Sequence, residues 1–226
     1  MNVVTDTEIN RPQAPMTMPE RRPFGGKTKS SHRMAERRVV TTLFCDVVGS
    51  SAMAELLDPE EWADVMNDVF EYLIRPIERY DGTVTQLMGD AVLALFGAPR
   101  AHEDDPQRAI LAALEIIESI QPLRERIKRR HGFDFNLRVG INTGLVVVGA
   151  FGADEVLEYT AMGDAINVAA RLQEMADPGT IRVGEATYRL AEQFFDFEPL
   201  GSSEVRGKRE RAKASPMCIT SSLNNR

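Results

Sequence analysis

The chain has 226 residues, of which 43% are hydrophobic and 27% are charged, and its formal net charge at pH 7 is −7. This composition predicts one folded domain with a sizeable core and excludes a disordered chain. The two cysteines lie far apart, which excludes a disulfide miniprotein. Residues 1–38 hold eight Lys and Arg against four Asp and Glu, so the rest of the chain is strongly acidic, which argues against a nucleic-acid groove.

The first 36 residues are rich in Pro, Thr, Ser and Arg and have no apolar period. We expect residues 1–36 to form a flexible basic arm, either a solvated leader or a docking tail, residues 37–220 to form the folded domain, and residues 221–226 to form a disordered tail. No apolar run approaches the roughly 20 residues of a membrane helix, and the start lacks a secretory signal. The sequence therefore predicts a cytoplasmic chain without a membrane span.

β-Branched apolar runs alternate with stretches of helical period in the first half of the domain. One strand end and one hairpin turn there carry an aspartate, Asp46 and Asp90. The expected elements are a strand over Val39–Cys45 that ends at Asp46, a helical stretch around Met53–Leu57, a helix that begins at Asp58 and stops at Asp81–Gly82, and strands over Thr83–Leu87 and Ala91–Phe96.

The second half continues the alternation, which favours one α/β or α+β sandwich with helices covering a sheet. The expected elements are one long helix from Asp105 towards Gly132, strands over Leu137–Ile141 and Leu145–Val148 around Asn142–Gly144, a helix opened by Gly163–Asp164 and closed by Asp177–Gly179, a strand over Thr180–Val183, a helix over Glu185–Phe194, and a strand-rich tail from Phe195.

Asp46 and Asp90 are the first candidates for chemistry. Each adjoins an apolar strand, where burial of a lone carboxylate is costly unless it is paired or binds a cation. Hard cations such as Mg²⁺ prefer carboxylate oxygens and often bridge them to phosphates. The pair therefore indicates a metal site, with solvated turn aspartates as the alternative.

Two further groups suit a phosphorylated ligand. Gly49, Ser50 and Ser51 directly follow the first strand and precede a helical stretch, so their backbone N–H groups offer an anion cradle or simply form a loop. Asn167 and Arg171 lie four apart on one helix and share a face. Arg171 could stabilise charge on a phosphoryl group, and the alternative is that both side chains are merely solvated.

Five segments, in this order, resemble the motifs of class III nucleotidyl cyclase catalytic domains. The resemblance covers about residues 38–220, and several ordered motifs are far more specific than one. The segments are Phe44–Ser51, Gln86–Val92, Arg138–Ile141, Glu158–Leu172 and Val205–Lys208.

The resemblance implies a catalytic domain that makes a 3′,5′-cyclic nucleotide and pyrophosphate from a nucleoside triphosphate. Two divalent cations, Mg²⁺ or Mn²⁺, would be held by Asp46, Asp90 and the Val47 carbonyl. The positions of four other residues in the motifs imply their roles in the same reaction. Asn167 would orient the ribose, Arg171 would stabilise the pentavalent transition state, and Arg138 and Arg206 would contact the phosphates.

The resemblance also implies an α+β fold, a ferredoxin-like βαββαβ variant, that works as a head-to-tail homodimer with sites at the interface. Gln86 and Thr160 occupy the positions that recognise the base. Thr160 resembles the adenylate-making members, whereas Gln86 fits neither group, since adenylate-making members usually have Lys there and guanylate-making members tend towards Glu. An amide both donates and accepts, so Gln86 can meet either base. The match at Thr160 favours ATP over GTP, with a guanylate or dual-specificity cyclase as the alternative.

A catalytically silent dimerisation or nucleotide-sensing module on the same fold is the hypothesis from another class, because fold alone does not imply activity. The presence of Asp46, Asp90 and Arg171 disfavours it. Members with Thr at the position of Thr160 are often bicarbonate-responsive, so the resemblance implies regulation by bicarbonate. Catalytic domains of this family are often attached to sensor or ATPase modules, so regulation by an attached domain is the other expectation.

Overall fold

The computed structural model describes residues 35–153, 156–199 and 217–219, which belong to one compact unit. Its strands are β1 (Glu36–Val48), β2 (Thr83–Met88), β3 (Ala91–Phe96), β4 (Asn136–Ala153), β5 (Val156–Met162), β6 (Thr180–Val183), β7 (Glu198–Pro199) and β8 (Met217–Ile219). They form an eight-stranded sheet of order β2-β3-β1-β4-β6-β8-β7, with β5 paired to β4. The pairs are antiparallel except β4 with β6.

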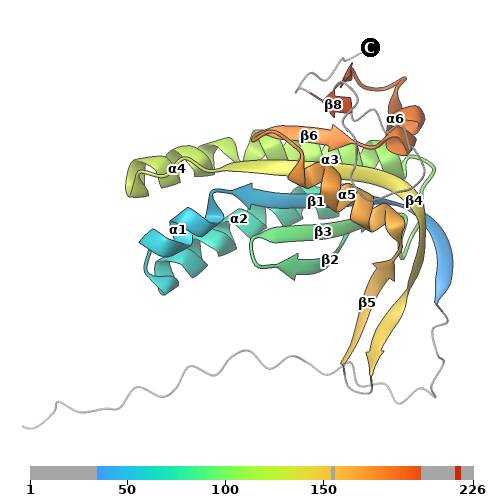
Figure 1. Ribbon diagram of the computed structural model, residues 1–226, viewed down its shortest axis with the longest axis horizontal. Helices are drawn as coiled ribbons and strands as arrows, with labels where there is room; N and C mark the ends of the chain where they lie inside the picture. The colour runs from blue at the N-terminus through green and yellow to red at the C-terminus, as the bar shows by residue number, and fades with distance from the viewer. Residues whose placement is uncertain (1–34, 154–155, 200–216, 220–226) are drawn as a thin grey trace, which may run out of the picture. The chain divides into compact units, whose positions relative to one another are not determined.

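The helices cover the sheet unequally. They are α1 (Ser50–Leu56), α2 (Pro59–Arg79), α3 (Asp105–Ser119), α4 (Gln121–His131), α5 (Asp164–Glu174) and α6 (Glu185–Ala191). Helices α2, α3, α4 and α6 contribute to the main core on one face, whereas α5 crosses the other face (Figure 1). In the described part of the chain, no helix combines the length and apolar character needed to span a membrane.

Successive side chains of β1 point in turn to a core face and to an open face of the sheet. Leu43, Cys45 and Val47 are buried in the main core beneath the helices. Phe44 and Asp46 point to the opposite face and are only partly buried, because successive strand side chains point to opposite sides. The open face, which also carries α5, is therefore the face available for a ligand.

Two glycines of β4 allow α5 to lie close to the sheet. A Cβ at Gly140 would lie 2.2 Å from the carbonyl oxygen of Ala169, and one at Gly144 would lie 2.8 Å from the Cβ of Ala165. Side chains larger than hydrogen at these positions would push the helix away. A hydrogen bond of 3.1 Å from Asn142 Nδ2 to the Ala165 carbonyl adds a polar tie.

The second half of β4 leaves the body as a two-stranded arm with β5 (Figure 1). Val147 pairs with Met162 at its base, and Gly149 pairs with Thr160 further out. The sequence does not predict β5 as a strand. Its pairing partner is β4, so it depends on contacts that the local pattern does not contain.

The start of α2 and the β2–β3 hairpin match the sequence-based expectations. Helix α2 begins after the N-cap Asp58 with Pro59 at its first position, and the chain leaves it through Asp81, whose φ is 60°. Strands β2 and β3 form the expected hairpin, and α6 ends at Ala191 rather than Phe194. The flexible arm expected over residues 1–36 lies outside the described residues except for its last two positions, and the disordered tail expected over residues 221–226 lies wholly outside them.

Three other expectations are wrong. The single helix expected from Asp105 towards Gly132 is divided at Ile120 into α3 and α4, because Pro122 has no N–H to donate to the preceding turn. The two strands around Asn142 are one strand, β4, since β1 pairs with it continuously from Asn136 to Val148. Strand β1 itself runs past Asp46 to Val48, because β4 continues to pair with it there, at Leu137 and Asn136.

Candidate active site

Asp46 and Arg138 form the centre of the open face. The two residues are directly opposite each other in β1 and β4, 92 positions apart in sequence. Arg138 Nε donates to Asp46 Oδ1 over 3.2 Å and Nη2 donates to Oδ2 over 2.8 Å. The side chain of Arg138 is 28% exposed and that of Asp46 is 18% exposed, so this two-pronged ion pair is partly shielded from water yet open to a ligand.

Other acidic residues besides Asp46 act on the Arg138 guanidinium. Hydrogen bonding to Asp46 raises the pKa of Arg138 above its ordinary value, while burial acts in the opposite direction. The charges of Glu174 and Asp90 add to the rise in this pKa. Arg138 Nη1 also lies 3.4 Å from the Glu174 carbonyl oxygen at the end of α5. One guanidinium thus faces Asp46 and the negative charges of its neighbours.

Asp90 reaches the site through the β2–β3 turn. It follows Gly89, whose φ is 64°, and precedes Ala91, which pairs with Asp46. The tight turn needs the left-handed backbone that glycine adopts readily. The structure therefore brings together the two carboxylates that the sequence singles out, next to an arginine.

The donor set at this place fits a hard divalent cation. Asp46 and Asp90 offer carboxylate oxygens, and the Val47 carbonyl follows directly in the chain. The Arg138 guanidinium already provides positive charge to both carboxylates, which is the charge that a cation would supply. No group of three or more His, Cys, Asp and Glu gathers for a metal within the described ranges, so a cation here would need further oxygens, such as those of a phosphate.

Gly49, Ser50 and Ser51 lie at the start of α1, directly after β1. Gly49 is its N-cap with a φ of 92°, and its carbonyl accepts a hydrogen bond of 3.1 Å from the Met53 N–H. The left-handed glycine turns the chain sharply from the strand into the helix. The first backbone N–H groups of α1 therefore lie a few residues beyond Asp46.

Asn167 and Arg171 lie one turn apart on α5. Asn167 is exposed and Arg171 is partly buried. The structure gives neither side chain a hydrogen bond or ion pair to another described residue, and none joins them to Asp46 or Asp90. They are thus presented on the open face without being engaged by the described part of their own chain.

The base-recognition candidates lie on neighbouring strands. Gln86 on β2 and Thr160 on β5 are both partly buried, and β2 and β5 approach each other. Gln86 pairs with Leu93, so its side chain is on the open face. Arg206, the remaining candidate, lies outside the described residues.

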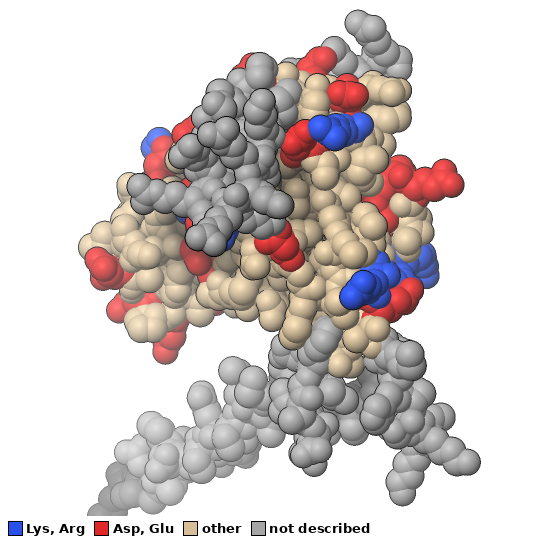
Figure 2. All heavy atoms as spheres, turned by 45° about the vertical axis from the view of Figure 1, so that its right-hand side comes forward, with Lys and Arg blue, Asp and Glu red and all other residues tan. Residues whose placement is uncertain are grey.

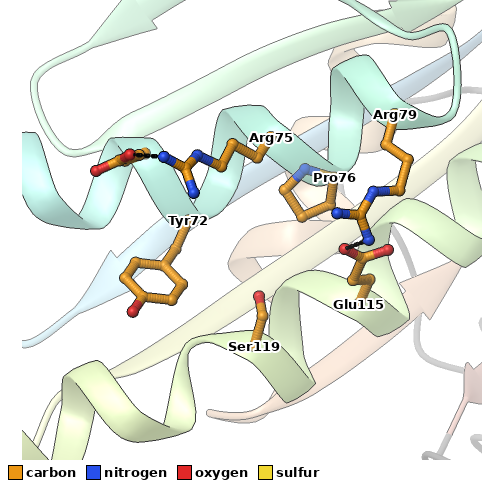
Figure 3. A pocket seen from close by; sticks show the side chains of 7 residues that line it. Tyr72, Arg75, Pro76, Arg79, Glu115 and Ser119 are labelled. Carbon is orange, nitrogen blue, oxygen red and sulfur yellow. Dashed lines mark hydrogen bonds and ion pairs between the residues drawn. The ribbon is translucent and has the colours of Figure 1, made fainter.

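Elsewhere on the described surface, many arginines are matched by carboxylates. Figure 2 shows acidic side chains scattered over the face it draws, with basic ones beside them. A hollow of about 230 Å³ lies between α2 and α3 (Figure 3). Arg79 donates to Glu115 there over 2.6 Å, and Arg75 pairs with Glu71. This hollow has no excess positive charge and lies on the helix-covered face, opposite Asp46.

A family model for the adenylate and guanylate cyclase catalytic domain matches residues 33–217. The chain belongs to this family. Adenylate cyclase 1 of Rhizobium meliloti (strain 1021) is 34% identical to this cyclase domain over 187 residues, or 82% of the chain. The match covers 27% of that relative, so the chain spans only about a quarter of its length.

Solved structures of both substrate types resemble the cyclase domain. The adenylyl cyclase CyaB from P. aeruginosa superposes with a TM-score of 0.80 at 26% identity, covering 84% of this chain and 98% of that one. The guanylyl cyclase Cya2 superposes with a TM-score of 0.71 at 30% identity, covering 82% and 91%. The predicted α+β cyclase fold is therefore confirmed, whereas the similarity does not select the base.

Sequence reasoning missed one feature of the cyclase site. The resemblance assigns Arg138 to phosphates, but it gives no sign that Arg138 binds Asp46 in the ligand-free domain. No local signal could reveal it, because the pairing depends on the register of β1 against β4. The structure thus adds a partner for Asp46 that must be considered in any account of cation binding.

Proposed function

We propose that this cyclase domain converts ATP to 3′,5′-cyclic AMP and pyrophosphate in a homodimer. The ribose 3′-oxygen attacks the α-phosphorus in line, and the bond from that phosphorus to the pyrophosphate oxygen breaks. The observation that carries the proposal is the gathering of Asp46, Asp90 and Arg138 on the sheet face that also bears α5.

Asp46, Asp90 and the Val47 carbonyl are assigned to two divalent cations, Mg²⁺ or Mn²⁺. When bound, these cations would lower the pKa of the 3′-hydroxyl and neutralise the leaving oxygens. Without a bound cation, Arg138 Nη2 donates a hydrogen bond of 2.8 Å to Asp46 Oδ2 and keeps the carboxylate in place. Once Asp46 turns to a cation, the planar fork of Arg138 is suited to a phosphate.

The triphosphate is assigned to groups that flank the carboxylates. Backbone N–H groups of Gly49, Ser50 and Ser51 begin directly beyond β1, next to Asp46. Arg206 supplies a second guanidinium in this assignment. Because the chain beyond residue 38 is strongly acidic, these specific donors, rather than a general positive field, would hold the phosphates.

Asn167 is assigned to orienting the ribose, and Arg171 to stabilising charge on the pentavalent phosphorus. Asp46 is engaged by Arg138, and within the described residues no hydrogen bond or ion pair joins it to Asn167 or Arg171. The absence of such a contact within the described part of one subunit supports a site completed by the partner. One subunit would supply Asp46, Asp90 and Arg138, and the other would supply Gln86, Thr160, Asn167, Arg171 and Arg206.

ATP is the proposed substrate, with GTP as the alternative. Thr160 is a rotating hydroxyl that can donate to or accept from the base, and the Gln86 amide can present its nitrogen to adenine or its oxygen to guanine. The proximity of β2 and β5 supports a joint role in base recognition. The resemblance of Thr160 to adenylate-making members, together with the similarity to adenylate cyclase 1, supports ATP.

A cytoplasmic location is also proposed. The buried thiol of Cys45 is free, as expected in a reducing compartment where ATP is available. Regulation by bicarbonate or by an attached domain is proposed from the same resemblance that assigns Thr160.

The test is product formation by the purified chain with ATP and GTP separately, in Mg²⁺ and in Mn²⁺, over a range of protein concentrations. Cyclic AMP in excess of cyclic GMP, with specific activity that rises as dimers form, is expected. An Asp46→Asn variant that folds but lacks turnover is the control. Comparable products would favour a dual-specificity cyclase, and no product would favour the silent module or a missing activating domain.

A further inference from the structure

Strand β2 contains a one-residue bulge at Thr85. Val84 pairs with Ala94 of β3, but the next pair joins Gln86 to Leu93, so the register shifts by one residue. Thr85 is therefore the extra residue, with no residue directly opposite it in β3. A bulge of this kind re-aims the side chains that follow it.

The bulge decides which face receives Gln86. Val84 packs against the main core on the helix-covered face. In a regular strand a residue two positions later points the same way, so Gln86 would be directed into that core. Instead Gln86 is opposite Leu93, which pairs with Phe44, and it thereby shares the open face with Asp46.

A side-chain hydrogen bond holds the bulge closed. The Thr85 hydroxyl donates to the Leu93 carbonyl oxygen over 3.2 Å in a partly buried position. Leu93 is also the residue opposite Gln86. The hydroxyl thus supplies a donor to the β3 backbone at the point where the regular ladder is interrupted.

We propose that Thr85 is a positioning residue for base recognition: its hydroxyl fixes the bulge that turns Gln86 towards the nucleotide base. The inference rests on the proposed function, in which Gln86 contacts the purine. A carboxamide reads a base by presenting either N–H or C=O, so its orientation sets the preference between ATP and GTP. Thr85 touches neither nucleotide nor cation in this account and acts only through Gln86.

The experiment compares Thr85→Val, which keeps the branched shape but removes the donor, with Thr85→Ser, which keeps the donor. The ratio of kcat/KM for ATP to that for GTP is expected to change about three- to tenfold in the Val variant, the range of one hydrogen bond. The Ser variant is expected to retain the wild-type ratio. Thr83→Val, two residues earlier in the regular part of β2, is the matched control and is expected to leave the ratio unchanged.

The same substitution in a Gln86→Ala background separates positioning from general damage. If Thr85 acts through Gln86, Thr85→Val changes the nucleotide ratio no further once the amide is absent. An unchanged ratio in Thr85→Val or in Gln86→Ala alone, or an equal change with and without Gln86, overturns the inference. Thermal melting of each variant accompanies the kinetics, because a structural role alone would lower the melting temperature without altering the ratio.

Displacement of a fluorescent ATP analogue by ATP and by GTP provides a readout independent of turnover. Binding without product formation in the wild-type domain would count against catalysis by this chain alone, while a ratio of affinities that shifts in Thr85→Val would still support the inference. Turnover in the wild-type domain with none of the expected shifts would refute the inference alone. Absence of nucleotide binding in every variant would refute both.

Discussion

Mixing two inactive variants is expected to restore cyclic AMP formation. Asp46→Asn disables the carboxylate half of each site while leaving an oxygen for the hydrogen bonds of Arg138, and Arg171→Ala disables the α5 half. In an equimolar mixture about half of the dimers are heterodimers, and each has one intact site of two. The mixture should therefore reach about a quarter of the wild-type specific activity, measured after incubation that allows subunits to exchange.

The control mixture combines Asp46→Asn with Asp90→Asn. Both substitutions affect the carboxylate half, which Arg138 draws together within one subunit, so every site in their heterodimer remains defective. No restoration is expected. Activity that stays at the level of the separate variants in the Asp46→Asn and Arg171→Ala mixture, although the subunits exchange, would refute the composite site. Equal recovery in the control would do the same.

Two other predictions concern the scaffold. Gly140→Ala is expected to destabilise the domain by about 1–3 kcal/mol in urea unfolding, because its Cβ would lie 2.2 Å from the Ala169 carbonyl oxygen; an unchanged midpoint would contradict the close packing of α5. Burial, and secondarily the charge of Asp46, raises the pKa of the Cys45 thiol, so the thiol stays neutral even near about pH 9. In a Cys218→Ser background, a thiol reagent should label Cys45 rapidly only after denaturation, and fast labelling of the native protein would show that the thiol is accessible.

Local signals predict those parts of the fold whose cause is itself local. Asp58 and Pro59 fix the start of α2, and a short continuous apolar run locates β3. The division between α3 and α4 was also available locally in Pro122, but the apolar period on either side of it favours one continuous helix.

Long-range pairing explains the remaining differences. Thr143 looks like part of a polar turn, yet it pairs with Thr41 of β1, so β4 passes through it unbroken. Its hydroxyl shares hydrogen bonds of 2.9 Å with those of Thr41 and Thr187. The ordered motifs supply the candidate site residues through resemblance. The pairing of Arg138 with Asp46 depends on strand register, which no short segment encodes.

The ion pair between Arg138 and Asp46 separates folding from cation loading. An internal counterion neutralises the carboxylate during folding, so the ligand-free domain does not bury a lone negative charge. In the proposed two-cation site, a divalent cation that binds Asp46 would compete with the Arg138 guanidinium, and its affinity would reflect that competition. The free cation concentration would then govern how many domains are competent for catalysis without governing how many are folded.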